Sequence, residues 1–226
     1  PAGMSSTVAE LLPSAAAGAL SPFPIIAVVV VLSTPRARRN GLAFLAGWLV
    51  GLTTLTVVVV SVVGGAAPGG EGSRALAWVR VLVGAALFAL AAKKWRSRPD
   101  PDGEPEAPRG MAPLGDLSAG RAVGGGLALA GANPKNIALT VAAVAAVSDL
   151  GAGARERLGV VVTYVALGSA SVAGAVLAHL VAGERAAAPL AAVKGFMLRN
   201  NTLIVVAVLV LLAVMIGSEG LGELRS

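Results

Sequence analysis

The residues of this sequence with the clearest chemical potential form the run Asn133-Pro134-Lys135-Asn136, which lies inside a long apolar segment, residues 121–148. Lys135 falls about 20 Å along that segment if it is a helix. A lysine at that depth of a membrane costs about 2.5–3.5 kcal/mol, so it should face the interior of a helix bundle. Pro134 removes an amide donor and disrupts the preceding turn. We therefore expect freed carbonyls, the amides of Asn133 and Asn136 and an ammonium group to form a ligand site at mid-membrane depth.

Two further sequences are candidates for the same site. Ser21-Pro22-Phe23-Pro24 interrupts the apolar segment 8–33, and two prolines this close cannot lie within a regular helix without freeing carbonyls. An inverted arrangement would bring Ser21, Pro22 and Pro24 to the depth of Lys135, whereas the simpler interpretation is a kink. Arg199 and Asn200 open the last apolar segment, where they either anchor and cap a helix or contact a headgroup.

Enzyme chemistry finds little support in the sequence. The chain has no cysteine and a single histidine, His179, and it contains neither a carboxylate cluster nor a glycine-rich phosphate loop. We therefore expect no catalytic residues, no metal and no cofactor. His179 is interpreted as structural, although a role for it or for Glu10 in proton coupling stays open.

Six apolar segments must position these residues. Hydrophobic residues make up 56% of the chain and charged residues 13%, against roughly 25% charged residues in soluble domains. A membrane-spanning helix needs about 20 apolar residues. The sequence predicts an all-α polytopic membrane protein with spans at 8–33, 41–64, 75–94, 121–148, 158–182 and 200–218. The stretch from Ala186 to Leu198 is either an interfacial amphipathic helix or an extension of the last span.

Lysine and arginine are distributed unequally between the connections. With the N-terminus outside, the cytoplasmic segments 34–40, 93–121 and 183–199 hold twelve of them and the outer segments hold four. Because positively charged loops stay in the cytoplasm, we predict a multi-pass protein of the plasma (inner) membrane with both termini outside. The net charge of +6 then serves orientation, and no nucleic-acid partner is expected.

The domain organisation follows from a proline-rich and acidic stretch in the middle of the chain. We interpret residues 1–3 as a cloning scar, 4–95 as a first three-helix repeat, 96–120 as a disordered cytoplasmic linker and 121–226 as a second three-helix repeat. An odd number of spans in each half makes the halves inverted relative to each other. The proline breaks at similar depth in the first and fourth spans favour such a repeat.

These features resemble the LysE exporter superfamily, and within it the actinobacterial GAP/Sap family of glycolipid-addressing proteins. The resemblance rests on six spans, a proline-broken first helix, Asn133-Pro134-Lys135-Asn136 in the fourth span and Arg199-Asn200-Asn201 before the last. It implies export of a glycolipid or a related lipid toward the cell surface.

The expected function is that of a membrane transporter that exports or flips a polar or anionic lipid or glycolipid. Lys135 would attract the headgroup, Asn133 and Asn136 would bond to it, and the breaks at Pro22 and Pro134 would allow alternating access. The alternatives are a small-solute exporter of the amino-acid type and a non-transporting scaffold for a lipid-synthesis or export complex. The expected partners are the lipid substrate and membrane lipids, and a homodimer is left open.

Overall fold

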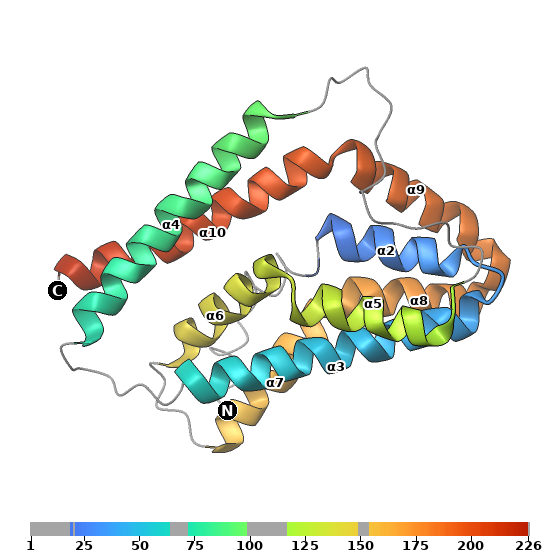
Figure 1. Cartoon of the computed structure of the whole chain (residues 1–226), viewed down its shortest axis with the longest axis horizontal. Helices are drawn as coiled ribbons and strands as arrows, with labels where there is room; N and C mark the ends of the chain where they lie inside the picture. Colours follow the sequence, from blue (N-terminus) through green and yellow to red (C-terminus); the bar gives the residue numbers. More distant parts are fainter. Residues whose placement is uncertain (1–18, 20, 64–71, 99–116, 149–153, 226) are drawn as a thin grey trace. The chain divides into compact units, whose positions relative to one another are not determined.

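The computed structural model describes residues 19, 21–63, 72–98, 117–148 and 154–225, and every regular element among them is a helix (Figure 1). In chain order the elements are α2 Pro22–Leu32, α3 Ala37–Val63, α4 Gly72–Arg96, α5 Ala119–Gly131, α6 Pro134–Ser148, α7 Ala154–Gly168, α8 Ala170–Ala182, the 3-10 helix η2 Gly183–Ala186, α9 Ala187–Arg199 and α10 Asn201–Arg225. The prediction of an all-α protein is confirmed for this part of the chain. Residues 1–3, Glu10 and most of the predicted linker 96–120 lie outside the described residues.

α3, α4 and α10 overlap the predicted spans 41–64, 75–94 and 200–218, and two other predicted spans each consist of two helices. The fourth span is α5 and α6, and the fifth is α7 and α8, which meet at Ser169. Within the described residues, three segments are long and apolar enough to cross a membrane: Ala37–Ser61, Ala170–Arg199 and Asn201–Gly222. The second of these is not a single straight helix, because Gly183 adopts a positive φ of 56° at the end of α8. The number of six spans therefore stays a prediction.

Two helices begin at the prolines that the sequence analysis singled out. α2 begins at Pro22 with Ser21 as its N-cap, and α6 begins at Pro134. Proline suits the first turn of a helix, because an N–H at that position has no partner within the helix. A proline leaves the carbonyl four residues before it without a helical donor. For Pro22 and Pro24 these carbonyls precede Ser21 in the sequence, so the prolines remove no hydrogen bond from α2 itself.

The chain divides into two compact units that both draw on its two sequence halves. Unit 1 comprises residues 1–64 and 105–199 and contains α2, α3 and α5 to α9. Unit 2 comprises residues 65–104 and 200–226 and contains α4 and α10.

The core of unit 1 is built around α2. All of its residues except Phe23 are buried, and it packs against α3, α8 and α9. A helix that is apolar on every side belongs in the middle of a bundle. On α3, Phe44, Trp48 and Leu52 face the same core, where they contact residues of α2 and of the later helices.

Glycines bring α3 and α5 into backbone contact. A Cβ atom added at Gly47 would overlap the carbonyl of Val123, and one added at Gly126 would overlap the carbonyl of Phe44. Gly51 also lies close to the backbone of α5, since its added Cβ would stand 2.7 Å from the oxygen of Leu127. Small residues at the crossing allow helices in lipid to associate through close packing. α3 and α5 therefore form a closely packed helix pair in unit 1.

Unit 2 uses the same principle in its single helix pair. An added Cβ at Gly84 of α4 would lie 2.9 Å from the Cα of Gly217 of α10, and one at Gly220 would lie 2.7 Å from the oxygen of Ala77. The two helices thus meet along a stripe of small residues rather than through interlocking large side chains.

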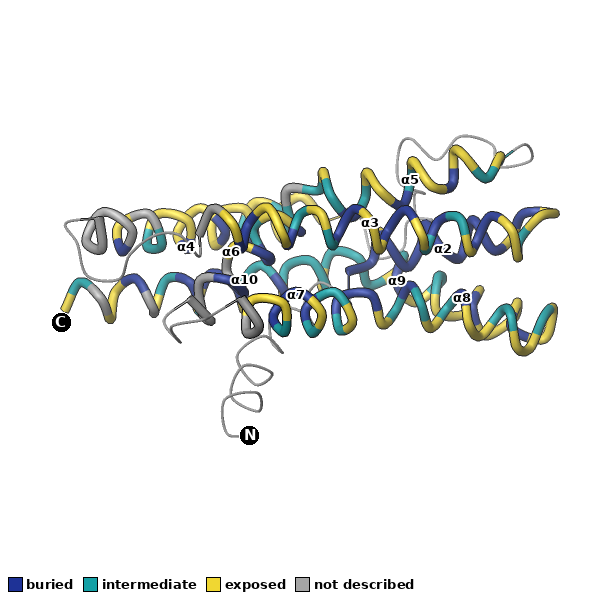
Figure 2. The backbone as a smooth tube through the Cα atoms, turned by 90° about the horizontal axis from the view of Figure 1, so that it is seen from below, coloured by how far each residue is buried: buried dark blue, intermediate teal, exposed yellow. Residues whose placement is uncertain are grey.

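Exposed residues lie along the helices of the described chain (Figure 2), and many of them are large and apolar. Val50, Val57 and Val58 on α3 are about half exposed, as are Trp78 and Phe88 on α4. A soluble protein rarely exposes apolar residues in this density, whereas a lipid-facing helix does. Together with the three long apolar segments, this surface identifies a membrane protein.

Candidate functional site

The interruption between α5 and α6 is the candidate site, and it holds four of the predicted site residues together. α5 ends at Gly131 with Ala132 as its C-cap, and α6 begins at Pro134. Asn133 lies between the two helices as the N-cap of α6, because its carbonyl accepts from the N–H of Ile137 at 3.0 Å. The chain therefore passes from one helix to the next within two residues.

Asn133 also caps α6 with its side chain. Its Oδ1 accepts a hydrogen bond of 3.0 Å from the N–H of Lys135. Because Pro134 has no N–H, this bond satisfies the first donor of the helix. The ammonium group of Lys135 remains the formal charge at this helix start, and the residue is half-buried.

Asn136 replaces the donors that the interruption removes from α5. In a continuous helix, the carbonyls of Leu129 and Ala130 would accept from residues 133 and 134. The Nδ2 of Asn136 instead lies 3.0 Å from the oxygen of Leu129 and 3.1 Å from that of Ala130. The side chain is 4% exposed and ties the end of α5 to the start of α6. The Nδ2 of Asn136 could not donate to a ligand without giving up one of these backbone partners, because both of its donors are used.

A buried chain of polar groups continues from Asn136 into α7. The hydroxyl of Thr140 lies 2.7 Å from the carbonyl of Asn136 and 3.2 Å from the hydroxyl of Tyr164. Since the Thr140 proton goes to the carbonyl, the Tyr164 hydroxyl is the donor in the second bond. Thr140 and Tyr164 are both buried. This chain connects α6 to α7, and Asn136 connects α6 to the end of α5.

The predicted second element of the site is the start of α2. Ser21 is 2% exposed and makes no capping hydrogen bond with its side chain. Pro22 and Pro24 are buried beside it, whereas Phe23 is exposed. α2 packs against α5 within unit 1, so both predicted breaks belong to the same unit. Participation of Ser21, Pro22 and Pro24 in ligand binding stays a prediction.

Arg199 and Asn200 lie at the boundary between the units. Arg199 is the exposed last residue of α9, and its guanidinium folds back over Gly195, whose added Cβ would lie 3.7 Å from Nη1. Asn200 is the turn residue before α10, and its carbonyl accepts from the N–H of Ile204 at 2.9 Å. α9 is thus a separate helix rather than an extension of α10. A headgroup contact at these residues stays a prediction.

Sequence reasoning missed two features of unit 1. The indole of Trp48 donates to the hydroxyl of Ser169 at 3.2 Å, which anchors the junction of α7 and α8 on α3. A pocket of about 940 Å³ opens between the α2–α3 turn and the α8–α9 turn, and Arg36, Arg38, Arg39 and His179 line it. From the sequence, these arginines are interpreted only as determinants of topology. The signal for an anion site was that three arginines lie within four residues, directly before a predicted helix.

A comparison with protein families gives one match over nearly the whole chain. The model of a family described as Sap, sulfolipid-1-addressing protein, matches residues 11–222. No curated protein and no solved structure matches the chain.

Proposed function

Because the chain belongs to the family of Sap, the sulfolipid-1-addressing protein, we propose that it exports or flips a polar or anionic lipid toward the cell surface. The family description supports a role in lipid export or addressing, and the apolar helices support a location in the membrane. In this proposal a glycolipid is the substrate class, and the protein is a transporter rather than an enzyme.

The observation that carries the proposal is Lys135 at the start of α6. The first turn of a helix carries the positive end of the helix dipole, and a lysine there adds a full charge. Transporters use the ends of broken helices at mid-membrane depth to bind charged groups. The headgroup would approach Lys135, while Asn133 and Asn136 hold the two helix ends together. The two-residue connection at Ala132 and Asn133 would be the hinge for alternating access.

A non-transporting scaffold is the second candidate, and a specific observation favours it. The side chains of Asn133 and Asn136 bond backbone groups of the interruption. This is the arrangement expected if the break only shapes the bundle. The small-solute exporter remains a variant of the transport hypothesis and differs from it in the substrate alone.

Replacing Lys135 tests the proposal. Lys135→Met keeps the length of the side chain and removes its charge. In proteoliposomes with a fluorescent sulfated galactosylceramide, we expect its transfer between leaflets to slow by about tenfold or more, because a charged hydrogen bond contributes about 1.5–3 kcal/mol. Transfer is measured by quenching with a membrane-impermeant reagent. The melting temperature should stay equal or rise, since a buried lysine is unfavourable.

The matched control is Lys194→Met, the same change at another half-buried lysine of unit 1. It should transfer the lipid at the rate of the unmodified protein. Transfer at that rate by folded Lys135→Met protein would refute the role of Lys135. Movement of free lysine but not of the lipid by the unmodified protein would favour the small-solute exporter, and movement of neither would favour the scaffold.

A further inference from the structure

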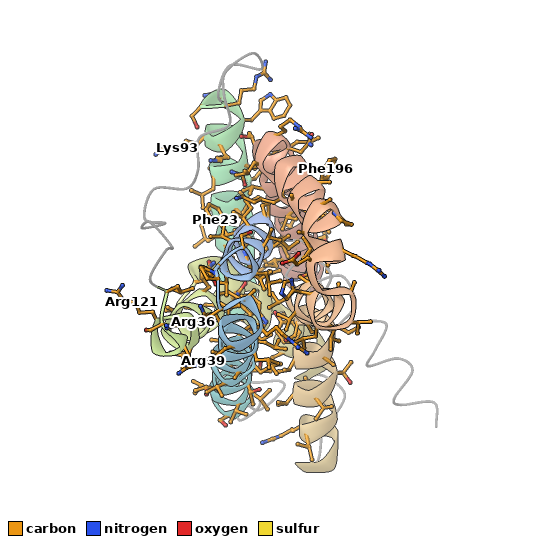
Figure 3. All side chains as sticks on the ribbon, turned by 90° about the vertical axis from the view of Figure 1, so that its right-hand side faces the viewer. Phe23, Arg36, Arg39, Lys93, Arg121 and Phe196 are labelled. Carbon is orange, nitrogen blue, oxygen red and sulfur yellow. The ribbon has the colours of Figure 1, made fainter. Side chains whose placement is uncertain are left out.

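The pocket at the end of unit 1 combines an apolar wall with a basic rim. The turns between α2 and α3 and between α8 and α9 lie at the same end of the unit (Figure 1) and border an open pocket of about 940 Å³. On the charged side, Figure 3 shows Arg36 and Arg39 close to each other at this end. All the residues that line the pocket belong to unit 1, and none belongs to the interruption at Asn133.

The positive charge of the rim is unfavourable for the helix that carries it. Arg36 precedes α3, and Arg38 and Arg39 lie in its first turn, which contains no acidic residue. The positive end of a helix dipole favours anions, and like charges repel each other. Among the described residues that line the pocket, Glu184 carries the one carboxylate, against three guanidinium groups. An anionic ligand would relieve this repulsion.

The turn that presents the arginines is held in place by its own polar groups. The amide of Asn40 donates to the hydroxyl of Thr34 at 3.2 Å and to the carbonyl of Leu117 at 2.8 Å. Thr34 in turn donates to the carbonyl of Val31 at 2.7 Å. These bonds connect the end of α2, the start of α3 and the approach to α5. The arginine side chains are exposed on this fixed turn, so their guanidinium groups can reach a ligand.

The wall of the pocket is apolar and comes from two helices. Val29 and Leu32 of α2 and Leu190 of α9 line it and are otherwise buried. His179 of α8 adds a half-buried imidazole. A role of the arginines in topology alone would require neither a cavity nor an apolar wall. A ligand that satisfies both sides of the pocket has an anionic head and a hydrocarbon part.

We propose that this pocket binds the sulfate or phosphate ester headgroup of a lipid, with the adjoining hydrocarbon against Val29, Leu32 and Leu190. The guanidinium groups of Arg36, Arg38 and Arg39 hold the ester oxygens, for which planar donor pairs are well suited. The inference rests on the proposed lipid-export function and adds to it a site of first capture. With the expected topology, this site lies at the cytoplasmic face, where the substrate is taken up.

Equilibrium binding to the full-length protein in detergent micelles tests the proposal. The probes are fluorescent dioleoyl phosphatidic acid and, as the zwitterionic comparison with no net charge, fluorescent dioleoyl phosphatidylcholine. The unmodified protein should bind the first lipid more tightly. The triple variant Arg36→Gln, Arg38→Gln, Arg39→Gln should bind it at least about tenfold more weakly, which corresponds to about 1.4 kcal/mol.

The control removes the same number of charges elsewhere in the chain. Lys93→Gln, Lys94→Gln, Arg96→Gln on α4 should leave binding within about twofold of the unmodified protein, because these residues do not line the pocket. A second variant, Ala187→Trp, fills the pocket without changing charge and should also weaken binding. Equal loss in both triple variants, or full binding by Ala187→Trp, would overturn the site.

Inorganic phosphate distinguishes a lipid site from a simple anion site. Phosphate should displace the lipid only at far higher concentration than unlabelled phosphatidic acid does, because it lacks the hydrocarbon part. Displacement at equal concentration would show that the apolar wall takes no part, and would overturn the lipid assignment.

Binding and transfer measurements distinguish the proposed role of Lys135 in transport from the proposed lipid site in the pocket. Lys135→Met should keep the arginine-dependent part of phosphatidic acid binding, which is the part that the triple arginine variant loses, because Lys135 does not line the pocket. Binding that depends on the arginines, in a protein that transfers no lipid in proteoliposomes, would refute the proposed transport and leave the site intact. Transfer without arginine-dependent binding would refute the site and leave the transport intact.

Discussion

At the scale of single residues, the run from Asn133 to Asn136 shows how a helix break is stabilised in an apolar segment. An unpaired carbonyl in lipid is unfavourable by several kcal/mol, so each carbonyl that loses its donor needs another. Asn136 supplies two donors, and Asn133 supplies the acceptor for the first free N–H. The polar residues of the break thus serve the backbone first. The side chain of Lys135, which carries the charge of the run, takes no part in these bonds of the two asparagines.

Asn136→Leu tests whether Asn136 stabilises the break between α5 and α6. The substitution keeps the size of the side chain and removes both donors to Leu129 and Ala130. We expect a loss of about 1–3 kcal/mol in the free energy of unfolding, because buried acceptors are left unsatisfied. Thermal unfolding in detergent, followed by circular dichroism, measures the effect.

Ile137→Leu is the control for Asn136→Leu. It places the same leucine at the neighbouring, exposed position without removing a hydrogen bond, and should alter stability by less than about 0.5 kcal/mol. If Asn136→Leu proved as stable as this control, the bonds to the end of α5 would not hold the interruption together.

The residue types of the candidate site were predictable, but their partners were not. Pro134 predicts an interruption because it lacks an N–H, and the interruption lies directly before it. That Asn136 reaches back six and seven residues to α5 depends on how α5 and α6 are oriented, which the sequence does not specify. The pocket beside the arginines was not predictable for a similar reason, since part of its lining comes from α8 and α9, which are distant in sequence.

At the scale of elements, the close contact of α3 with α5 depends on glycines at particular positions. Gly126 and Gly124 lie on the same helix, but only Gly126 faces the backbone of α3, while nothing lies within 4 Å of a Cβ atom added at Gly124. The two positions form a matched pair, because helix propensity changes equally in both and only the contact differs.

Gly126→Ala should destabilise unit 1 by about 1–3 kcal/mol, because the added methyl group forces the two helices apart. Gly124→Ala should leave stability unchanged or raise it by up to about 1 kcal/mol, because alanine is the better helix former. Melting temperatures of the two variants in the same detergent measure the difference. Equal melting temperatures would show that the helices separate at little cost and that the close packing is not required.

The helices themselves were largely predictable from long apolar runs that end at prolines or charged residues. The junction of α7 and α8 was not, because Ser169 follows no proline and its N–H still bonds the carbonyl of Val165 at 3.0 Å. The pairing of helices was not predictable either. With 29 glycines in the chain, most helices offer a stripe of small residues, and the sequence does not identify which stripes meet.

At the scale of the whole molecule, the helix contacts agree with what an inverted repeat would require. Exchange of the two halves would map the pair of α3 and α6 onto that of α8 and α2, and both pairs are in contact within unit 1. The pair of α4 and α10 would map onto itself. Intertwined halves also explain why each unit draws helices from both. The repeat of residues 4–95 and 121–226 stays a prediction that superposition of the halves would test.

The orientation of the chain in the membrane is the prediction on which the capture site depends. Twelve lysines and arginines lie in the segments expected in the cytoplasm and four in those expected outside. Because the chain has no cysteine, single cysteines can be introduced one at a time. In intact cells, a membrane-impermeant maleimide should label Ser226→Cys and leave Ser97→Cys and Arg38→Cys unlabelled until the membrane is permeabilised. Labelling of Ser97→Cys from outside would reverse the topology and place the arginine pocket at the outer face, where it would release a lipid instead of capturing one.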